Sequence, residues 1–168
     1  DVGCVATNAQ DVATLASLAS IPDNNVDAAY AKTISGMVST DGAILEIGPL
    51  SKATVAAYVN QLVKKSGRTT CLTRSYVTGL NGTVSIAYET ECAGTAAFTK
   101  TFTGQIVIAN QASKFLNSGD SGSLLGEDVA TNPHAIGLLY AGSVATAIAN
   151  PINEVLAWCG PNFTMVGY

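Results

Sequence analysis

The chain has 168 residues, and its eight Lys and Arg against twelve Asp and Glu give a formal net charge of −4. Hydrophobic residues make up 48% of the sequence and charged residues only 12%, which excludes disorder for the bulk of the chain. The sequence has no basic run and no Lys or Arg after Lys114, so it lacks the charge pattern of a nucleic-acid-binding protein. Its single histidine, His134, excludes a metal site built from several histidines, and we expect no cofactor.

Two features of the sequence bear on where the protein works. The longest uncharged stretch, residues 129–153, is interrupted by Pro133 and Gly142, whereas a membrane-spanning helix needs about 20 mostly apolar residues. We therefore expect no membrane span. Four cysteines in a chain poor in charge predict a secreted or extracytoplasmic protein with up to two disulfides, and free buried thiols are the alternative. Four cysteines allow three pairings, between which sequence alone does not choose.

The first half of the chain predicts two short strands and one helix. Apolar runs bounded by turn residues predict strands at 27–34 and 43–48. Ser51 precedes a segment rich in Ala and Val and can cap it, so residues 51–63 are predicted to be helical.

The second half predicts mainly strands. Alternating segments on both sides of Asn81-Gly82 predict a hairpin over Tyr76–Glu89, because Asn-Gly favours a two-residue turn. The further predicted elements are strands at 98–108, 123–125 and 135–142 and a short C-terminal helix at 153–158. Many short strands with little helix favour an all-β barrel or sandwich.

The most specific pattern in the sequence is Gly119-Asp120-Ser121-Gly122-Ser123. A serine between glycines at a tight bend can expose its hydroxyl, and the backbone N–H groups of Gly119 and Ser121 can then converge on one point. Two such donors form an oxyanion hole for a tetrahedral acyl-transfer intermediate. For a bare five-residue pattern, an ordinary turn is the alternative.

This pattern resembles the nucleophile loop of chymotrypsin-like serine peptidases, and four other segments resemble secreted bacterial members of that family. They are Asn24–Ala31 (NNVDAAYA), Lys65–Thr70 (KSGRTT), Ala135–Gly142 (AIGLLYAG) and Asn150–Leu156 (NPINEVL). The resemblance covers nearly the whole chain from about Cys4 onward. It implies an all-β fold of two six-stranded antiparallel barrels, with the site in the cleft between them and a short C-terminal helix.

The resemblance also implies roles for individual residues. Ser121 would be the nucleophile, Asp27 the carboxylate that orients the general base, and Gly119 an oxyanion donor through its N–H. Asp120 would be buried and paired with Lys65, which would hold the oxyanion loop in shape, since an unpaired buried carboxylate is costly. The alternatives are a surface aspartate that caps a turn for Asp27 and a solvated side chain for Lys65.

Substrate-binding residues follow from the same resemblance. Phe115 would lie at the base of the primary pocket, with Tyr140, Ala141 and Gly142 along its wall, where they would pair with an extended peptide. The absence of an acid at position 115 gives no reason to expect cleavage after Lys or Arg. We expect a preference for small or medium apolar side chains, and the alternative is that Phe115 belongs to the core.

The general base of such a site is a histidine that precedes the aspartate, yet residues 1–26 contain none. We interpret His134 as an exposed loop residue. The histidine is therefore expected on a segment upstream of Asp1, with residues 1–50 forming the remainder of an N-terminal barrel and residues 51–168 the C-terminal barrel with its helix. A separate N-terminal fragment of the same protein is the expected partner.

Two functions are compatible with the sequence. The first is a secreted serine endopeptidase that acts on peptides or proteins through an acyl-enzyme. The second is a non-catalytic relative, a binding or structural module or an inactive fragment of the same fold. Two cysteines depart from the family's pattern, Cys71 in place of a glycine and Cys159 in place of an apolar residue, so we expect them to pair and leave Cys4 with Cys92.

Overall fold

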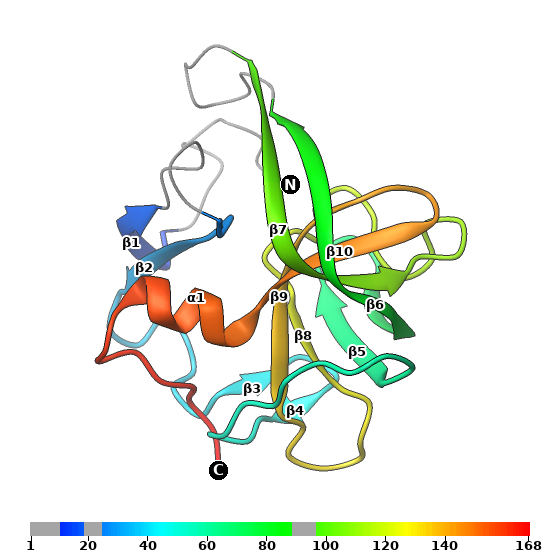
Figure 1. Ribbon diagram of the computed structural model, residues 1–168. Helices are drawn as coiled ribbons and strands as arrows, with labels where there is room; N and C mark the ends of the chain where they lie inside the picture. Colours follow the sequence, from blue (N-terminus) through cyan, green and yellow to red (C-terminus); the bar gives the residue numbers. More distant parts are fainter. Residues whose placement is uncertain (1–10, 19–24, 89–96) are drawn as a thin grey trace.

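The computed structural model describes residues 11–18, 25–88 and 97–168, and the structural statements below concern these residues. They form an all-β fold with a single short helix near the C-terminus (Figure 1). In chain order, the elements are β1 Ala13–Leu18, β2 Ala29–Thr33, β3 Ala43–Ile44, β4 Gly48–Pro49, β5 Leu62–Gly67, β6 Cys71–Tyr88, β7 Phe98–Ala109, β8 Leu124–Glu127, β9 Ala135–Gly142, β10 Thr146–Pro151 and α1 Ile152–Cys159.

Six of the strands form a closed antiparallel barrel in the order β10-β7-β6-β5-β8-β9. Its interior is filled by apolar side chains from every wall strand, including Val63, Val77, Ile108, Leu125 and Leu139, each fully buried. Because the barrel is closed, each strand has a neighbour on both sides, and its backbone hydrogen bonds are made to those neighbouring strands.

The part of the chain before the barrel contributes two separate two-stranded sheets. β1 pairs with β2, and β3 pairs with β4, all antiparallel. Neither sheet is joined to the barrel by strand pairing. The described part of the chain therefore consists of one complete six-stranded barrel and, N-terminal to it, two separate two-stranded sheets.

The helix α1 closes one side of the barrel. Pro151 precedes it and Gly160, with a φ of 119°, ends it, as the sequence predicts. Ile152 and Val155 face inward and pack with Val26 and Ala135 in a second core cluster. In the described part of the chain, no helix is long and apolar enough to cross a membrane.

Three secondary-structure predictions differ from the structure. The predicted hairpin at 76–89 is not formed, because β6 runs as one strand from Cys71 to Tyr88, with its first part paired to β5 and residues 77–88 paired to β7. The Asn81-Gly82 pair lies at an irregularity of this ladder, where Asn81 has a φ of 54° and a Cβ on Gly82 would collide with Val107. A positive φ serves a β-bulge as well as a tight turn, and here it bends one long strand.

The predicted helix at 51–63 is also absent. The segment wraps the barrel in an extended form, and its backbone bonds to other strands and to the C-terminus: Ser51 N–H to Pro133, Lys52 N–H to Tyr168 and Val55 N–H to Ala135. These long-range bonds replace the local ones of a helix. The single strand predicted at 43–48 is instead a short hairpin: β3 and β4 pair with each other around a tight turn in which Glu46 has a φ of 64°.

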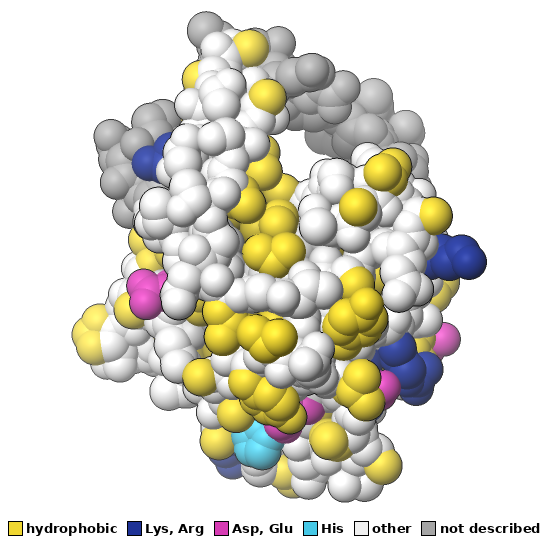
Figure 2. Space-filling model, turned by 45° about the vertical axis from the view of Figure 1, so that its right-hand side comes forward, with side chains coloured by type: hydrophobic (Ala, Val, Ile, Leu, Met, Phe, Trp, Pro, Cys, Tyr) yellow, Lys and Arg dark blue, Asp and Glu magenta, His cyan; other side chains and the backbone are white. Residues whose placement is uncertain are grey.

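The surface and the cysteines complete the description. Figure 2 shows one face of the molecule on which hydrophobic side chains form a broad band and charged side chains are few. The expected Cys71–Cys159 disulfide is not formed, because both residues are free thiols, the first of them exposed. Cys4 and Cys92 lie outside the described residues.

Candidate active site

The loop that carries Ser121 is attached to β9. Gly122 N–H donates to the carbonyl of Leu139 at 2.7 Å, and Leu139 N–H donates to the carbonyl of Ser123 at 3.0 Å. Ser121 itself is exposed, and its Oγ donates to the carbonyl of Tyr140 at 3.2 Å. The loop therefore presents an exposed serine hydroxyl beside β9, and backbone hydrogen bonds to β9 fix the loop in place.

The backbone around Ser121 has two N–H groups without partners. Asp120 N–H donates to Asn117 and Ser123 N–H donates to Asp120, whereas within the described residues those of Gly119 and Ser121 donate to no protein acceptor. Gly119 has a φ of 93°, in the left-handed region that favours glycine. Among the described residues, these two N–H groups are available as donors, and two such donors aimed at one point can hold a developing oxyanion.

A buried carboxylate holds this loop in shape. Asp120 Oδ2 lies 3.3 Å from Lys65 Nζ, and both side chains are fully buried. The same carboxylate accepts hydrogen bonds from the N–H groups of Thr69 and Thr70, from the Thr70 hydroxyl and from Asn117 N–H. The ion pair expected from the sequence is therefore present, and Thr70 joins it because its Oγ1 also accepts a hydrogen bond from Lys65 Nζ.

These contacts determine the charge of Asp120. Burial acts to raise its pKa, but the hydrogen bonds from the Thr70 hydroxyl and from the three backbone N–H groups outweigh burial and lower the pKa to about 2. Asp120 is consequently ionised at neutral pH.

Asp27 lies just before β2, and its position depends on the barrel. Its backbone N–H donates to Asn150 Oδ1 at 3.1 Å, and Asn150 Nδ2 donates back to its carbonyl at 2.9 Å. Asn150 is fully buried at the end of β10. Two residues earlier, Asn25 makes the same two-way bond with the backbone of Thr103 on β7, at 2.8 Å in each direction. Two side-chain amides thus fix the backbone of Asp27 onto the barrel.

The carboxylate of Asp27 has one partner in the described part of the chain. The Tyr88 hydroxyl donates to Oδ2 at 2.7 Å, and Oδ1 accepts no hydrogen bond there. Burial raises the pKa of Asp27 above its ordinary value, and the Tyr88 hydrogen bond opposes this effect. Burial raises the pKa of Tyr88 and of Tyr140 as well, and the negative charge of Asp27 adds to both shifts.

One cavity joins the two residues proposed from the sequence as nucleophile and acid. It has a volume of about 340 Å³ and is lined by Asp27, Ala28, Ala29, Ser121, Gly122, Leu138, Leu139 and Tyr140. The structure thus brings Asp27 and Ser121, which are far apart in the sequence, to the wall of the same cavity.

A second cavity lies on the other side of Ser121. It has a volume of about 280 Å³ and is lined by Ser113, Leu116, Asn117, Ser118, Ser121, Ala141, Gly142 and Ser143. Ala141 and Gly142 form part of its wall, while Tyr140 lines the first cavity. Phe115 is not among the lining residues: it is only 2% exposed and packs in the barrel core. The structure places Phe115 in the core, and its neighbour Leu116 lines the cavity instead.

His134 lies outside both cavities. Its Nδ1 is 2.5 Å from Glu127 Oε2, and its backbone N–H donates to the same oxygen at 3.1 Å. The side chain is 40% exposed. His134 therefore pairs with a carboxylate between β8 and β9, away from Ser121.

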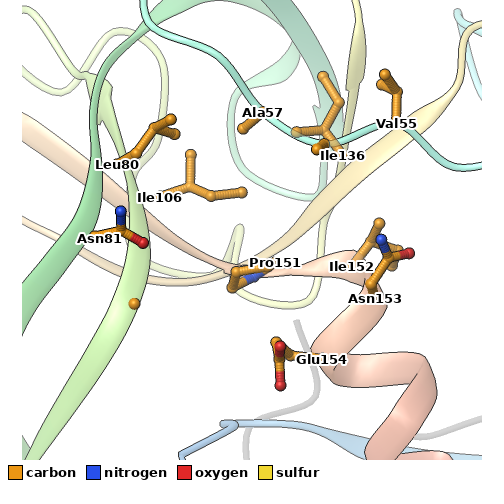
Figure 3. Close-up of a pocket in the computed structure, with 12 residues that line it drawn as sticks. Val55, Ala57, Leu80, Asn81, Ile106, Ile136, Pro151, Ile152, Asn153 and Glu154 are labelled. Carbon is orange, nitrogen blue, oxygen red and sulfur yellow. The ribbon is translucent and has the colours of Figure 1, made fainter.

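A further cavity lies apart from the proposed site residues. A cavity of about 240 Å³ with mainly apolar walls lies where β6, β7 and the start of α1 meet, among Val55, Ile106 and Ile152 (Figure 3), and none of the proposed site residues lines it. Among the described residues, no group of His, Cys, Asp or Glu is placed to hold a metal ion.

Sequence reasoning missed two residues of the site, Tyr88 and Asn150. Both act on Asp27 across more than sixty residues of sequence. Asn150 stands in the Asn-Pro pair ahead of α1, which signals a helix start but not a contact with Asp27. Tyr88 ends an alternating strand and carries no local signal.

Comparison with solved structures finds proteases of similar fold. The solved structure of Cellulomonas bogoriensis chymotrypsin is 25% identical with a TM-score of 0.65, over 93% of this chain and 76% of that chain. Thermobifida fusca protease A is 19% identical with a TM-score of 0.64, over 93% and 75%. A glutamic acid specific serine protease is 22% identical with a TM-score of 0.63, over 91% and 74%. No protein-family model and no curated protein sequence matches the chain. The chain has the fold of bacterial chymotrypsin-like serine proteases.

Proposed function

We propose that the protein is a secreted serine endopeptidase, with Ser121 as its nucleophile and Asp27 as the carboxylate that orients the general base. The observation that carries the proposal is the cavity of about 340 Å³ that both residues line. Its size is sufficient for an imidazole between the serine hydroxyl and the carboxylate. The free N–H groups of Gly119 and Ser121 supply the electrostatic part of the mechanism.

The reaction proceeds through an acyl-enzyme. The base removes the proton of Ser121 as Oγ attacks the carbonyl carbon of the peptide, and the carbonyl electron pair moves onto oxygen, where the two N–H groups stabilise it. The tetrahedral intermediate collapses, and the protonated base gives its proton to the departing amine. Water then attacks the ester with the same base as proton acceptor, and the carboxylic acid and the serine hydroxyl are released.

The base in this proposal is an imidazole on a polypeptide segment outside the 168 residues, because His134 is paired with Glu127 and lines neither cavity. Asp27 Oδ1, which has no partner among the described residues, would accept its N–H. We assign residues 1–50 to the first barrel that this segment completes and residues 51–168 to the second barrel.

The substrate side chain would enter the cavity of about 280 Å³ beside Ser121. Its walls hold no charged residue, and its polar groups are serine hydroxyls and the amide of Asn117. Leu116 supplies the only large apolar side chain among them. A wall of this composition favours small, uncharged side chains before the cleaved bond, while Ala141 and Gly142 would bind the peptide backbone.

One observation favours a second candidate function, a non-catalytic binding module of the same fold. The only histidine of the chain lies away from Ser121, and a serine without a base keeps only the residual catalysis that the oxyanion hole and substrate binding provide. In that case, the same cleft would bind a peptide without cleaving it.

Added imidazole distinguishes the two functions. A fluorophosphonate reacts when the serine oxygen displaces fluoride from phosphorus and a base takes the serine proton. We expect covalent labelling of Ser121 to accelerate with imidazole concentration, to vanish in Ser121→Ala and to persist in the control Ser39→Ala, an exposed serine bonded to Asp41. Peptide mapping by mass spectrometry locates the adduct. Absence of an adduct at Ser121 at every imidazole concentration would favour the binding module.

The source of the base has its own measurement. Intact-mass analysis of the native protein under non-denaturing conditions should show a second, histidine-containing polypeptide, or a longer chain that includes one. The assignment of the base would be wrong if native protein that contains neither a second histidine-bearing polypeptide nor a longer chain reacts with the fluorophosphonate as fast without imidazole as with it.

A further inference from the structure

The end of β6 reaches the candidate active site through one side chain. Tyr88 is the last residue of β6, and its hydroxyl lies 2.7 Å from Asp27 Oδ2. Its ring is half-buried and stacks on Phe98, the first residue of β7, with the ring centres 5.1 Å apart and the planes at 17°. Tyr88 and Phe98 are also cross-strand partners in the ladder. The phenol is therefore held from both strands.

A row of aromatic rings continues from this contact to the nucleophile loop. Phe102, fully buried, packs against Tyr88 at 6.4 Å on one side and against Tyr140 at 5.2 Å on the other. The carbonyl of Tyr140 accepts the hydrogen bond of Ser121 Oγ. Tyr88 therefore packs, through Phe102, against the residue whose carbonyl binds Ser121. A shift of Tyr88 would alter the surroundings of both Asp27 and Ser121.

The groups around Asp27 show what the Tyr88 hydroxyl supplies. Among the described residues, the titratable groups that face the carboxylate are Tyr88 from β6 and Tyr140 from β9, and Asn150 from β10 binds only the backbone. Both phenols have a raised pKa and stay protonated at neutral pH. Within the described residues, the Tyr140 hydroxyl is buried without a partner, so Tyr88 is the donor that the carboxylate uses.

We propose that Tyr88 is a positioning residue of this active site, whose hydroxyl fixes the Asp27 carboxylate through Oδ2 and leaves Oδ1 for the imidazole base. The inference rests on the proposed function. A carboxylate held by a neutral donor keeps one orientation without losing the negative charge that the imidazole needs. The bond also counteracts the burial that otherwise favours the protonated acid.

Tyr88→Phe tests the role, with Tyr30→Phe as the matched control. Tyr30 lies on β2, where its ring packs against the rings of Trp158 and Phe163. It does not line the Asp27–Ser121 cavity. Two quantities are measured: the pKa of Asp27, from the carboxyl carbon signal of ¹³C-labelled protein, and fluorophosphonate labelling of Ser121 as a function of imidazole concentration. Near-UV circular dichroism reports whether the packing is retained.

In Tyr88→Phe, we expect the pKa of Asp27 to rise by about one unit and the half-saturating imidazole concentration to rise by about fivefold, while labelling without imidazole falls by a much smaller factor. Tyr30→Phe should match the unaltered protein in each. The inference is wrong if the pKa of Asp27 does not move, or if labelling with and without imidazole falls together, which is what a purely structural role gives. Faster labelling would also overturn it, since Tyr88 would then block the base.

The two proposals fail separately. If the unaltered protein gives no adduct at Ser121 with imidazole, the proposed function is wrong, and the catalytic role of Tyr88 fails with it. If the unaltered protein is labelled but Tyr88→Phe leaves both the pKa of Asp27 and the imidazole dependence as they were, only the role of Tyr88 is refuted.

Discussion

The backbone of Asp27 is fixed by hydrogen bonds, so the carboxylate is not needed to hold the residue in place and can bind another group. Asn150 satisfies the N–H and the carbonyl, so neither depends on the charge of the side chain. The carboxylate is partly buried and gains one hydrogen bond from Tyr88, which does not replace the solvation that burial removes. A group whose charge is disfavoured by its own fold is typical of functional sites.

Asp27→Asn should therefore stabilise the protein at neutral pH. Because the folded-state pKa of Asp27 is raised, the folded protein binds the proton more tightly than the unfolded chain, and stability falls as the pH rises past the unfolded value of 3.8. A neutral amide removes this cost. We expect the free energy of unfolding in urea to increase at pH 7 and imidazole-dependent labelling of Ser121 to fall by roughly a hundredfold or more.

The matched control is Asp41→Asn. Asp41 is exposed, and hydrogen bonds from Ala43 N–H and the Ser39 hydroxyl lower its pKa, so the sign is reversed and its replacement should not stabilise the protein at pH 7. A loss of stability in Asp27→Asn larger than that in Asp41→Asn would contradict the interpretation of Asp27.

At the residue scale, the sequence predicts what is encoded locally. The glycines around Ser121 are visible in one short segment, whereas the pairing of Asp120 with Lys65 joins residues far apart in the sequence and is expected from the family resemblance. The family resemblance predicts Phe115 at the base of the substrate cavity. In the structure, Phe115 lies in the core and its neighbour Leu116 lines the cavity. A pattern identifies the segment but not which of two adjacent apolar side chains points inward, because the surrounding barrel decides that.

At the scale of elements, the loop from Asn117 to Ser123 depends on a carboxylate that the loop itself contributes. Asp120 accepts hydrogen bonds from the turn after β5 and lies against Lys65 on that strand. The loop and β5 are therefore held together by one buried ion pair. Removal of one partner would leave a buried charge unpaired, which typically costs about 3–5 kcal/mol.

Asp120 should make the loop sensitive to acid, because the hydrogen bonds that it accepts lower its pKa. The folded-state pKa of Asp120 is about 2 against 3.8 in the unfolded chain, so its contribution is complete above about pH 4 and is lost as the pH falls through 2. The difference corresponds to about 2 kcal/mol. Urea unfolding of the unaltered protein between pH 2 and pH 7 should show this loss.

The double variant Lys65→Met/Asp120→Asn is the control for that measurement. It should lack this acid-dependent part of the stability and should be more stable at pH 7 than Asp120→Asn alone, because no unpaired charge remains buried. If the double variant is as unstable as the single one, the ion pair is not what holds the loop to β5.

The elements show why some predictions failed. The alternation of apolar and polar residues over 76–88 correctly indicates extended strand structure. The Asn81-Gly82 pair, however, predicts a turn that is not formed. The pairing of residues 77–88 of β6 with β7 outweighs the local turn preference, and Asn81 lies at an irregularity of this ladder. Likewise, the Ala- and Val-rich segment 51–63 gives its backbone bonds to β9 and to the C-terminus. Local preference is weak where long-range pairing is available.

At the scale of the whole molecule, the two parts of the chain differ in how they are supported. The barrel is closed and its interior is filled, whereas β1 with β2 and β3 with β4 are two-stranded sheets. Four of the five residues of β2 are exposed. A two-stranded sheet is only marginally stable in water without a further layer. The N-terminal strands therefore depend on their few contacts with the barrel side, such as Tyr30 against Trp158 and Phe163.

Amide hydrogen exchange should reveal this difference directly. We expect β5, β9 and β10 to exchange only through global unfolding and β1 and β2 to exchange at least about a hundredfold faster through local opening. Val26 and Asp27 should be intermediate, because Val26 is buried against α1 and Asn150 fixes the Asp27 backbone. If a histidine-bearing segment completes the first barrel, its addition should slow exchange in β1–β4 and leave β9 unchanged. Exchange in β1 and β2 as slow as in β9 from the outset would mean that these strands are already part of a stable unit, and the need for a completing segment would disappear.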